Sequence, residues 1–158
     1  MTEETTTQPG AAATVTLREI TKETLRDFLS LKVSDTQQNF VANNAVSVAQ
    51  AHFEPKAWFR GIYADETAVG FVMLFEDADK SEYYLWRFMI DQRYQGCGYG
   101  WQALQRLVEV VKTRPGAVEL LVSYVPGDGS PGEFYHKFGF VDTGEEDDGE
   151  LVSKLRLS

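Results

Sequence analysis

The sequence predicts a single α/β domain with a mixed β-sheet, and three features of the pattern lead to this fold class. The 158 residues are 43% hydrophobic, which is enough for one core of ordinary size. Segments typical of strands are interspersed with segments that carry apolar residues at helical spacing. Between residues 82 and 113, an apolar strand, a glycine-rich turn and a long helix follow one another, which indicates a right-handed crossover between parallel strands.

Seven segments have the alternation, or the aromatic and β-branched content, that is typical of strands. They cover residues 14–20, 56–63, 67–75, 82–91, 118–125, 140–143 and 150–157. The segment 82–91 carries few charges, so it is expected to lie buried at the centre of the sheet. The acidic residues 144–149 are expected to form the turn of the last hairpin.

Four segments are predicted to be helical. The first two follow Thr21 and the pair Asn43 and Asn44, whose side chains can cap a helix. The other two cover residues 99–113, with an apolar stripe along one face, and residues 131–137. Alternating hairpins and helices of these lengths are typical of a compact α/β domain.

Residues 1–13 contain almost nothing to bury, so they are expected to form a flexible leader before one domain that covers residues 14–158. The start lacks the features of a signal peptide, and no run of about 18 apolar residues could span a bilayer. Cys97 is the single cysteine, with no metal-ligand spacing around it, so neither a disulfide nor a metal is expected. A soluble cytoplasmic protein is predicted.

The charge balance is acidic, with 15 Lys and Arg against 24 Asp and Glu and a net charge of −9. This charge repels phosphate backbones and anionic membranes, so neither nucleic acid nor a membrane is expected as a partner. It would attract a small polycation, although solubility alone also explains an acidic composition. Charge by itself therefore leaves the ligand open.

The densest chemical signal is a glycine-rich turn before the long helix, formed by Gln95, Gly96, Cys97, Gly98, Tyr99 and Gly100. Glycines permit a positive φ and a close approach of the ligand, and the helix start favours an anion. The turn is therefore predicted to bind phosphate, with a ligand-free turn as the alternative. A dinucleotide site would need G-x-G-x-x-G and a P-loop would need Lys-Ser/Thr, and neither pattern fits.

Two motifs resemble those of the GNAT superfamily of N-acetyltransferases. Gln95-x-x-Gly98-x-Gly100 matches its Q/R-x-x-G-x-G/A signature, and FYHKFGF at residues 134–140 is similar to its F/L-Y-x-K/S-x-G-F segment. The strand and helix order agrees with the family from residue 14 to 157. Within the superfamily, the segments WRFMIDQRYQGCGYG, SYVPGDGSPGEFYHKFGF and AVSVAQAHFEP are similar to bacterial spermine/spermidine (diamine) N-acetyltransferases.

The resemblance implies a GNAT-type, mostly antiparallel central sheet that is splayed between its fourth and fifth strands and flanked by helices. It also implies acetyl-coenzyme A as the cosubstrate. The amides from Gln95 to Gly100, together with Trp101, would surround its pyrophosphate. Met89 and Ile90 would offer main-chain groups to its pantetheine arm.

Further roles are implied near the C-terminus. Tyr135 aligns with the tyrosine that protonates the departing thiolate, a task that suits a phenol, and a packing tyrosine is the alternative. Asp128 falls where the family commonly carries Asn. Since a carboxylate cannot donate a hydrogen bond, the contact of Asp128 with pantetheine is expected to be weaker.

The motifs quoted above do not include a residue for the general base. Tyr84 stands where some family members carry Glu, and Glu82 has the same strand parity, so Glu82 is the candidate base, with a solvated strand-end charge as the alternative. Arg87 is expected to form a structural ion pair. A nucleophilic role for Cys97 is disfavoured because no His lies close in the sequence. Residues 43–54 are the candidate acceptor wall.

The resemblance implies direct transfer of an acetyl group to a primary amine of a small cationic acceptor such as spermidine or spermine. Two alternatives remain open at this stage. One is acetylation of protein N-termini, lysines or other small amines, and the other is a non-catalytic acyl-coenzyme A sensor. The hairpin edge at residues 140–157 is compatible with a homodimer.

Overall fold

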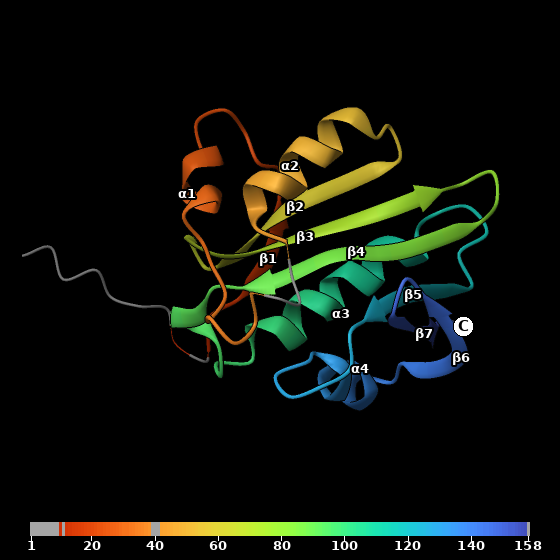
Figure 1. Cartoon of the computed structure of the whole chain (residues 1–158). Coiled ribbons are helices and arrows are strands. Elements are labelled where there is room, and N and C mark those ends of the chain that lie inside the picture. The colour runs from red at the N-terminus through yellow and green to blue at the C-terminus, as the bar shows by residue number, and fades with distance from the viewer. Residues whose placement is uncertain (1–9, 11, 39–41, 158) are drawn as a thin grey trace, which may run out of the picture.

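The computed structural model describes residues 10, 12–38 and 42–157, and these form one mixed sheet with helices on both faces (Figure 1). The strands are β1 (Val15–Arg18), β2 (Ala57–Ala64), β3 (Thr67–Asp77), β4 (Glu82–Ile90), β5 (Glu119–Tyr124), β6 (Val141–Asp147) and β7 (Glu150–Arg156). The helices are α1 (Leu25–Leu29), α2 (Asn44–Phe53), the 3-10 helix η1 (Gln92–Tyr94), α3 (Tyr99–Lys112) and α4 (Gly132–Phe138).

The strand order of the sheet is β1-β2-β3-β4-β5-β7-β6. Every neighbouring pair is antiparallel except β4 with β5, which are joined through α3 and run parallel. The predicted fold class, a mostly antiparallel α/β sheet with one parallel pair, is confirmed. No helix in the described ranges is long and apolar enough to cross a membrane.

The two faces of the sheet carry separate cores. Leu104, Leu107 and Val111 of α3 are fully buried against one face, and Tyr135 of α4 belongs to the same core. Phe28 of α1 is fully buried in the core on the other face, which α1 and α2 cover (Figure 1). A Cβ on Gly61 of β2 would lie 2.2 Å from the Phe28 ring, so this glycine makes the room that the ring needs.

Some predicted boundaries were wrong for local reasons. The helix expected after Thr21 begins only at Leu25, because the Thr21 N–H donates to Thr24 Oγ1 (2.9 Å) in a turn that precedes the helix. Asn43 caps α2 as predicted, accepting the Val46 N–H at 2.9 Å. The turn expected over residues 144–149 contains only Asp148 and Gly149, both at positive φ, which is the tight two-residue turn that favours Asp-Gly.

Part of the expected leader packs on the domain. Ala13 is 7% exposed and belongs to the core on the α3 face, and the Tyr99 hydroxyl donates to the Gly10 carbonyl at 2.7 Å. Residues 1–9 and 11 lie outside the described residues. Chain packing against α3 has therefore begun by Ala13.

A β-bulge in β4 changes which residues face which side. Met73 pairs with Arg87 but Leu74 pairs with Leu85, so Trp86 is the extra residue of β4. Before the bulge, Leu85 belongs to the core on the α3 face. After it, Met89 and the bulged Trp86 pack into the core on the α1 and α2 face. The bulge thus places Arg87 on the α2 side instead of in the α3 core.

The end of β4 is held in place by a buried carboxylate. Asp91 is 1% exposed and accepts the Lys32 N–H at 3.0 Å and both the N–H and the Nε of Arg93 at 2.9 and 2.8 Å. Burial alone would raise the pKa of Asp91, but the hydrogen bonds from Arg93 and Lys32 outweigh it, so the pKa lies below its usual value. Asp91 thereby ties β4 to the segment after α1.

We expect Asp91→Asn to lower the free energy of unfolding by about 2 kcal/mol at pH 7, since hydrogen bonds to a buried charged group are lost. Folding lowers the pKa of Asp91, so the stabilisation is present above the unfolded-state pKa and is lost as the pH falls through the lowered folded-state pKa. The free energies of unfolding of the wild type and of Asp91→Asn, measured in urea, should therefore converge as the pH is lowered from 7. The exposed Asp79→Asn is the control, and a pH-independent difference for Asp91→Asn would contradict the interpretation.

Candidate active site

A cleft of about 910 Å³ opens where β4 and β5 separate. The two strands pair only through Tyr84 with Leu121 and Leu85 with Val122, and they diverge beyond these pairs. The walls of the cleft come from β4, from the glycine-rich turn before α3, from the end of β5 with the following segment 129–131, from α4 and from the β6–β7 hairpin. The divergence of two parallel strands therefore creates the hollow.

The glycine-rich turn forms one end of this cleft. Gly96 and Gly98 have φ values of 81° and 83°, which glycine adopts without strain, and a Cβ at either position would meet no atom of the described residues within 4 Å. The first α-helical hydrogen bond of α3 runs from the Gln102 N–H to the Gly98 carbonyl. The amides of Gly100 and Trp101 precede it and have no partner within the helix. Such a turn can bind an anion.

Gln95 closes the turn back onto β4. Its Nε2 donates to the Ile90 carbonyl at 2.8 Å and to Gln37 Oε1 at 2.9 Å. The Ile90 carbonyl lies beyond the last β4–β5 pair, so the Gln95 side chain supplies a partner that β5 does not. This contact explains in physical terms why a glutamine at the start of the motif is useful.

The structure brings most of the predicted site residues together. The cleft wall contains Glu82, Met89, Ile90, Gln95, Gly96, Gly98, Tyr99, Gly100, Trp101 and Tyr135. Two predicted residues lie elsewhere. Cys97 is half-buried, with its thiol 3.9 Å from the Gln95 carbonyl, and Asp128 is exposed. In the segment after β5, the wall is formed instead by Gly129, Ser130 and Pro131.

Tyr135 lies on the α4 side of the cleft and is 5% exposed. Aromatic rings surround it, with the centroids of Phe140, Phe134 and Tyr124 at 5.5, 5.7 and 6.5 Å. Burial raises the pKa of the Tyr135 phenol well above its usual value. The phenol is therefore protonated throughout the neutral range and can donate a hydrogen bond into the cleft.

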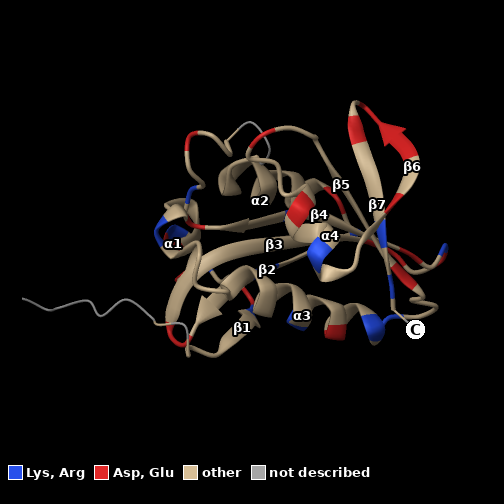
Figure 2. Cartoon of the chain, turned by 90° about the horizontal axis from the view of Figure 1, so that it is seen from below, with Lys and Arg blue, Asp and Glu red and all other residues tan. Residues whose placement is uncertain are grey.

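The opposite end of the cleft is acidic. Glu82, Asp147 and Glu150 line it, and Figure 2 shows acidic residues along β6 and at its turn. Burial raises the pKa of the Tyr84 phenol, and the negative charges of the same three carboxylates raise this pKa further. These carboxylates therefore surround one point of β4, and a cation would be stabilised there.

Arg87 does not form the predicted ion pair. No carboxylate of the described residues lies within 4.0 Å of its guanidinium, which donates to the Trp86 carbonyl at 3.0 Å and to Gln50 Oε1 at 3.2 Å. Its Nε is buried without a partner among the described residues, and burial lowers the pKa of Arg87. Arg87 lacks a carboxylate partner because the bulge directs its side chain toward α2. The polar side chain of α2 that it contacts is Gln50, which is neutral.

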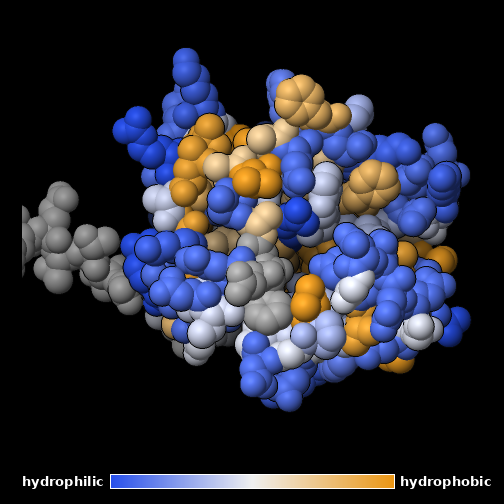
Figure 3. Space-filling model, in the orientation of Figure 1, coloured by the Kyte–Doolittle hydropathy of each residue, from blue (hydrophilic) through white to orange (hydrophobic). Residues whose placement is uncertain are grey.

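The predicted acceptor wall needs correction. In this part of the chain the cleft is lined by Val33, Gln37 and Ala42, and by no residue of 43–54. α2 instead presents apolar side chains to solvent, with Val46 43% and Phe53 83% exposed, and Figure 3 shows apolar side chains at the surface over α1 and α2. The wall therefore comes from the segment that leads into α2.

Sequence reasoning missed a polar cluster beside Tyr135. Tyr124 lines the cleft, and its hydroxyl is hydrogen-bonded to Asp142 and close to His136. No sequence signal pairs these residues, because they lie on β5, α4 and β6 and meet only in the folded chain. Among the described residues, no group of three or more His, Cys, Asp or Glu side chains could hold a metal ion.

The cleft between the diverging strands thus contains both the glycine turn and a buried tyrosine. Residues 16–140 match the acetyltransferase (GNAT) family, so the chain belongs to this family and is an acetyltransferase. The chain is 29% identical over 154 residues to the spermine/spermidine N(1)-acetyltransferase of Bacillus subtilis (strain 168), covering 90% of this chain and 99% of that protein.

Solved structures share the fold at low sequence identity. The PaiA N-acetyltransferase of Thermoplasma acidophilum, in complex with coenzyme A, has a TM-score of 0.69 at 16% identity, covering 90% of this chain and 98% of that chain. The ribosomal-protein-S18-alanine N-acetyltransferase of Escherichia coli has a TM-score of 0.68 at 16% identity, covering 91% and 94%. At these identities the likeness establishes the GNAT fold and nothing finer.

We expect Gly100→Ala to be tolerated, in contrast to its neighbours at positive φ. A Cβ on Gly100 would meet Ile90 and Phe134 at 3.6 Å, an ordinary contact. Because glycine inside a helix is less favourable than alanine, the free energy of unfolding should rise by about 0.5–1 kcal/mol. Urea unfolding measures this, and a loss of stability would show that the start of α3 is packed more tightly than described.

Proposed function

We propose that the protein transfers the acetyl group of acetyl-coenzyme A directly to a primary amine of a small cationic acceptor such as spermidine or spermine. The observation that carries this proposal is one continuous cleft with an anion-binding turn at one end and carboxylates at the other. Tyr135 lies in the wall of this cleft. An anionic donor and a cationic acceptor would each find a complementary end.

The glycine turn fits the pyrophosphate of the cosubstrate. Acetyl-coenzyme A is strongly anionic and the protein carries a net charge of −9, so binding requires a local site of opposite character. The amides at the start of α3 and the helix dipole provide it. The absence of side-chain atoms at Gly96 and Gly98 lets the phosphates approach these amides. The cleft volume of about 910 Å³ also suits a ligand of this size.

The far half of β4 fits the pantetheine arm. Beyond Leu85, the side of β4 toward β5 has no strand partner among the described residues, so the backbone groups of β4 that point away from β3, such as the Ile90 N–H, can form hydrogen bonds with an amide-bearing ligand. Across the cleft, Gly129, Ser130 and Pro131 form the facing wall in place of Asp128. Bound in this way, the cosubstrate supplies the activated acetyl thioester.

Tyr135 and Glu82 have complementary roles in the proposed transfer. The amine nitrogen forms a bond to the acetyl carbon while the carbon–sulfur bond breaks. Tyr135 donates its proton to the departing sulfur, which its protonated phenol permits at neutral pH. Glu82, at the exposed start of β4, accepts the proton of the amine through water. The proton given by Tyr135 is then restored from solvent.

The acidic end supports a cationic acceptor. Asp147 and Glu150 stand with Glu82 in the cleft wall, where they can hold distal ammonium groups while one amine enters uncharged. The relative from Bacillus subtilis, matched over nearly its full length, is named for spermine and spermidine. Charge and relationship thus support the same class of acceptor.

Gly98→Val should abolish coenzyme A binding, because its side chain would occupy the open space in front of the α3 amides. Gly144→Val is the matched control. Gly144 also has a positive φ, 85°, with open space around a Cβ, but it lies on β6 outside the cleft wall. Titration calorimetry with coenzyme A should show loss of binding for the first variant alone. Equal affinity in a folded Gly98→Val protein would refute the cosubstrate site.

Spermine should be a better substrate than an amine of similar length with an uncharged tail, and its kcat/KM should fall with added salt. Asp147→Asn and Glu150→Gln should each raise the KM for spermine between about two- and fivefold, as expected for exposed ion pairs. Glu145→Gln, an exposed carboxylate on the same hairpin but outside the cleft wall, is the control. Equal kcat/KM for the two amines, or turnover of an N-terminal peptide alone, would exclude the polyamine acceptor.

A further inference from the structure

We propose that Tyr124, His136 and Asp142 form a hydrogen-bonded clamp that fixes α4 against β5 and β6 and so positions Tyr135 at the cleft. The three are positioning residues that act through Tyr135. The inference rests on the proposed role of Tyr135 as the proton donor, but nothing in it depends on which amine is the acceptor.

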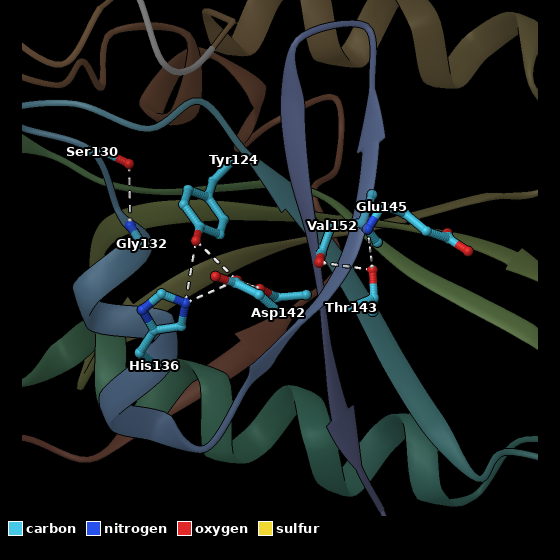
Figure 4. A network of polar contacts seen from close by, with 9 residues as sticks. Tyr124, Ser130, Gly132, His136, Asp142, Thr143, Glu145 and Val152 are labelled. Atoms are coloured by element: carbon cyan, nitrogen blue, oxygen red, sulfur yellow. Dashed lines mark hydrogen bonds and ion pairs between the residues drawn. The ribbon is translucent and has the colours of Figure 1, made fainter.

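The contacts of the clamp converge on one carboxylate oxygen, as Figure 4 shows. Asp142 Oδ1 accepts from the Tyr124 hydroxyl at 2.9 Å and lies 2.9 Å from His136 Nε2. Because a carboxylate can only accept, the hydrogen of the imidazole is placed on Nε2. Ser153 Oγ donates to the same oxygen. These hydrogen bonds hold the pKa of Asp142 below its usual value despite partial burial, with His136 as the largest cause.

The clamp joins α4 to two strands that are not direct neighbours in the sheet. Tyr124 ends β5, His136 lies in the last turn of α4 and Asp142 lies near the start of β6. α4 has only seven residues, so its own hydrogen bonds are a weak constraint on its position. Its placement therefore depends on tertiary contacts, of which this polar cluster is one.

The Tyr124 ring also supports the first turn of α4. A Cβ on Gly132 would lie 2.7 Å from this ring, so the helix backbone packs directly on it. The Gly132 N–H donates to Ser130 Oγ at 3.3 Å. Tyr124 thus contacts the start of α4 through its ring and the last turn of α4 through its hydroxyl, which lies 3.2 Å from His136 Nε2 (Figure 4).

The position of Tyr135 depends on the clamp, because Tyr135 is the residue next to His136 on the same short helix. Its ring lies in the cleft wall beside that of Tyr124, at a centroid distance of 6.5 Å. The Tyr124 hydroxyl belongs to a side chain that is only 6% exposed, so it needs a partner, and Asp142 supplies one. If the clamp opens, α4 is released and the hydroxyl of Tyr135 is displaced from the sulfur.

A double-mutant cycle tests this coupling. At saturating substrates, with any amine that is turned over, His136→Ala should lower kcat between about tenfold and a hundredfold, as for a misplaced catalytic group, with the KM for acetyl-coenzyme A unchanged. In a Tyr135→Phe background the same change should alter kcat less than about twofold, because the group it positions is gone. His136→Gln, which keeps an N–H donor, should restore most of the activity. Lys137→Gln, exposed on the same helix, is the control.

A second measurement requires no turnover. In protein with 13C-labelled tyrosine, the resonance of the Tyr135 hydroxyl-bearing carbon, assigned through Tyr135→Phe, should shift in His136→Ala and in Asp142→Asn but not in Lys137→Gln. An unchanged resonance, or an equal loss of kcat in both backgrounds of the cycle, would overturn the clamp. If the wild type turned over no amine, the proposed function would be contradicted. The resonance of Tyr135 would still show whether the clamp positions this residue.

Discussion

β4 and β5 are parallel neighbours that stay paired over only two residue pairs, and the site depends on where they part. The crossover through α3 forces β5 to begin beside the start of β4, while the bulge at Trp86 changes the direction of β4 just beyond the last pair. Past that point β4 remains paired with β3, but its other side has no strand partner among the described residues. Backbone groups need hydrogen-bond partners, so the gap is suited to an extended ligand that takes the place of a strand.

The two ends of the gap have opposite electrostatic character. At one end, the space around Gly96 and Gly98, next to the start of α3, is free of other atoms of the described residues. At the other, the β6–β7 hairpin brings Asp147 and Glu150 next to Glu82. Both ends are anchored to β4, one through the contact of Gln95 with the Ile90 carbonyl and the other through the start of the strand itself. A donor and an acceptor of opposite charge would therefore meet at the middle of β4, beside Tyr135.

Local signals in the sequence predicted much of this arrangement. The glycine turn, the apolar stripe of α3 and the Asn43 cap each depend on residues close in the chain, and each lies where the pattern placed it. The bulge at Trp86 has no such signal, since it arises from the pairing with β3. The bulge moves the side chains of the later β4 residues to the opposite face of the sheet. This explains why Arg87 contacts Gln50 and not a carboxylate. The contact of Tyr124 with Asp142 was likewise unpredictable, because it joins two strands that are not neighbours in the sheet.

The most direct measurement is amide hydrogen exchange of the intact protein with and without coenzyme A. If the gap between β4 and β5 holds the cosubstrate, the amide of Ile90, which points away from β3, and those at residues 96–101 should gain protection together. The amides of β1 and of the outer face of α3 should be unchanged. Protection confined to other surfaces, or none at saturating coenzyme A, would contradict the assignment of this gap as the acetyl-donor site.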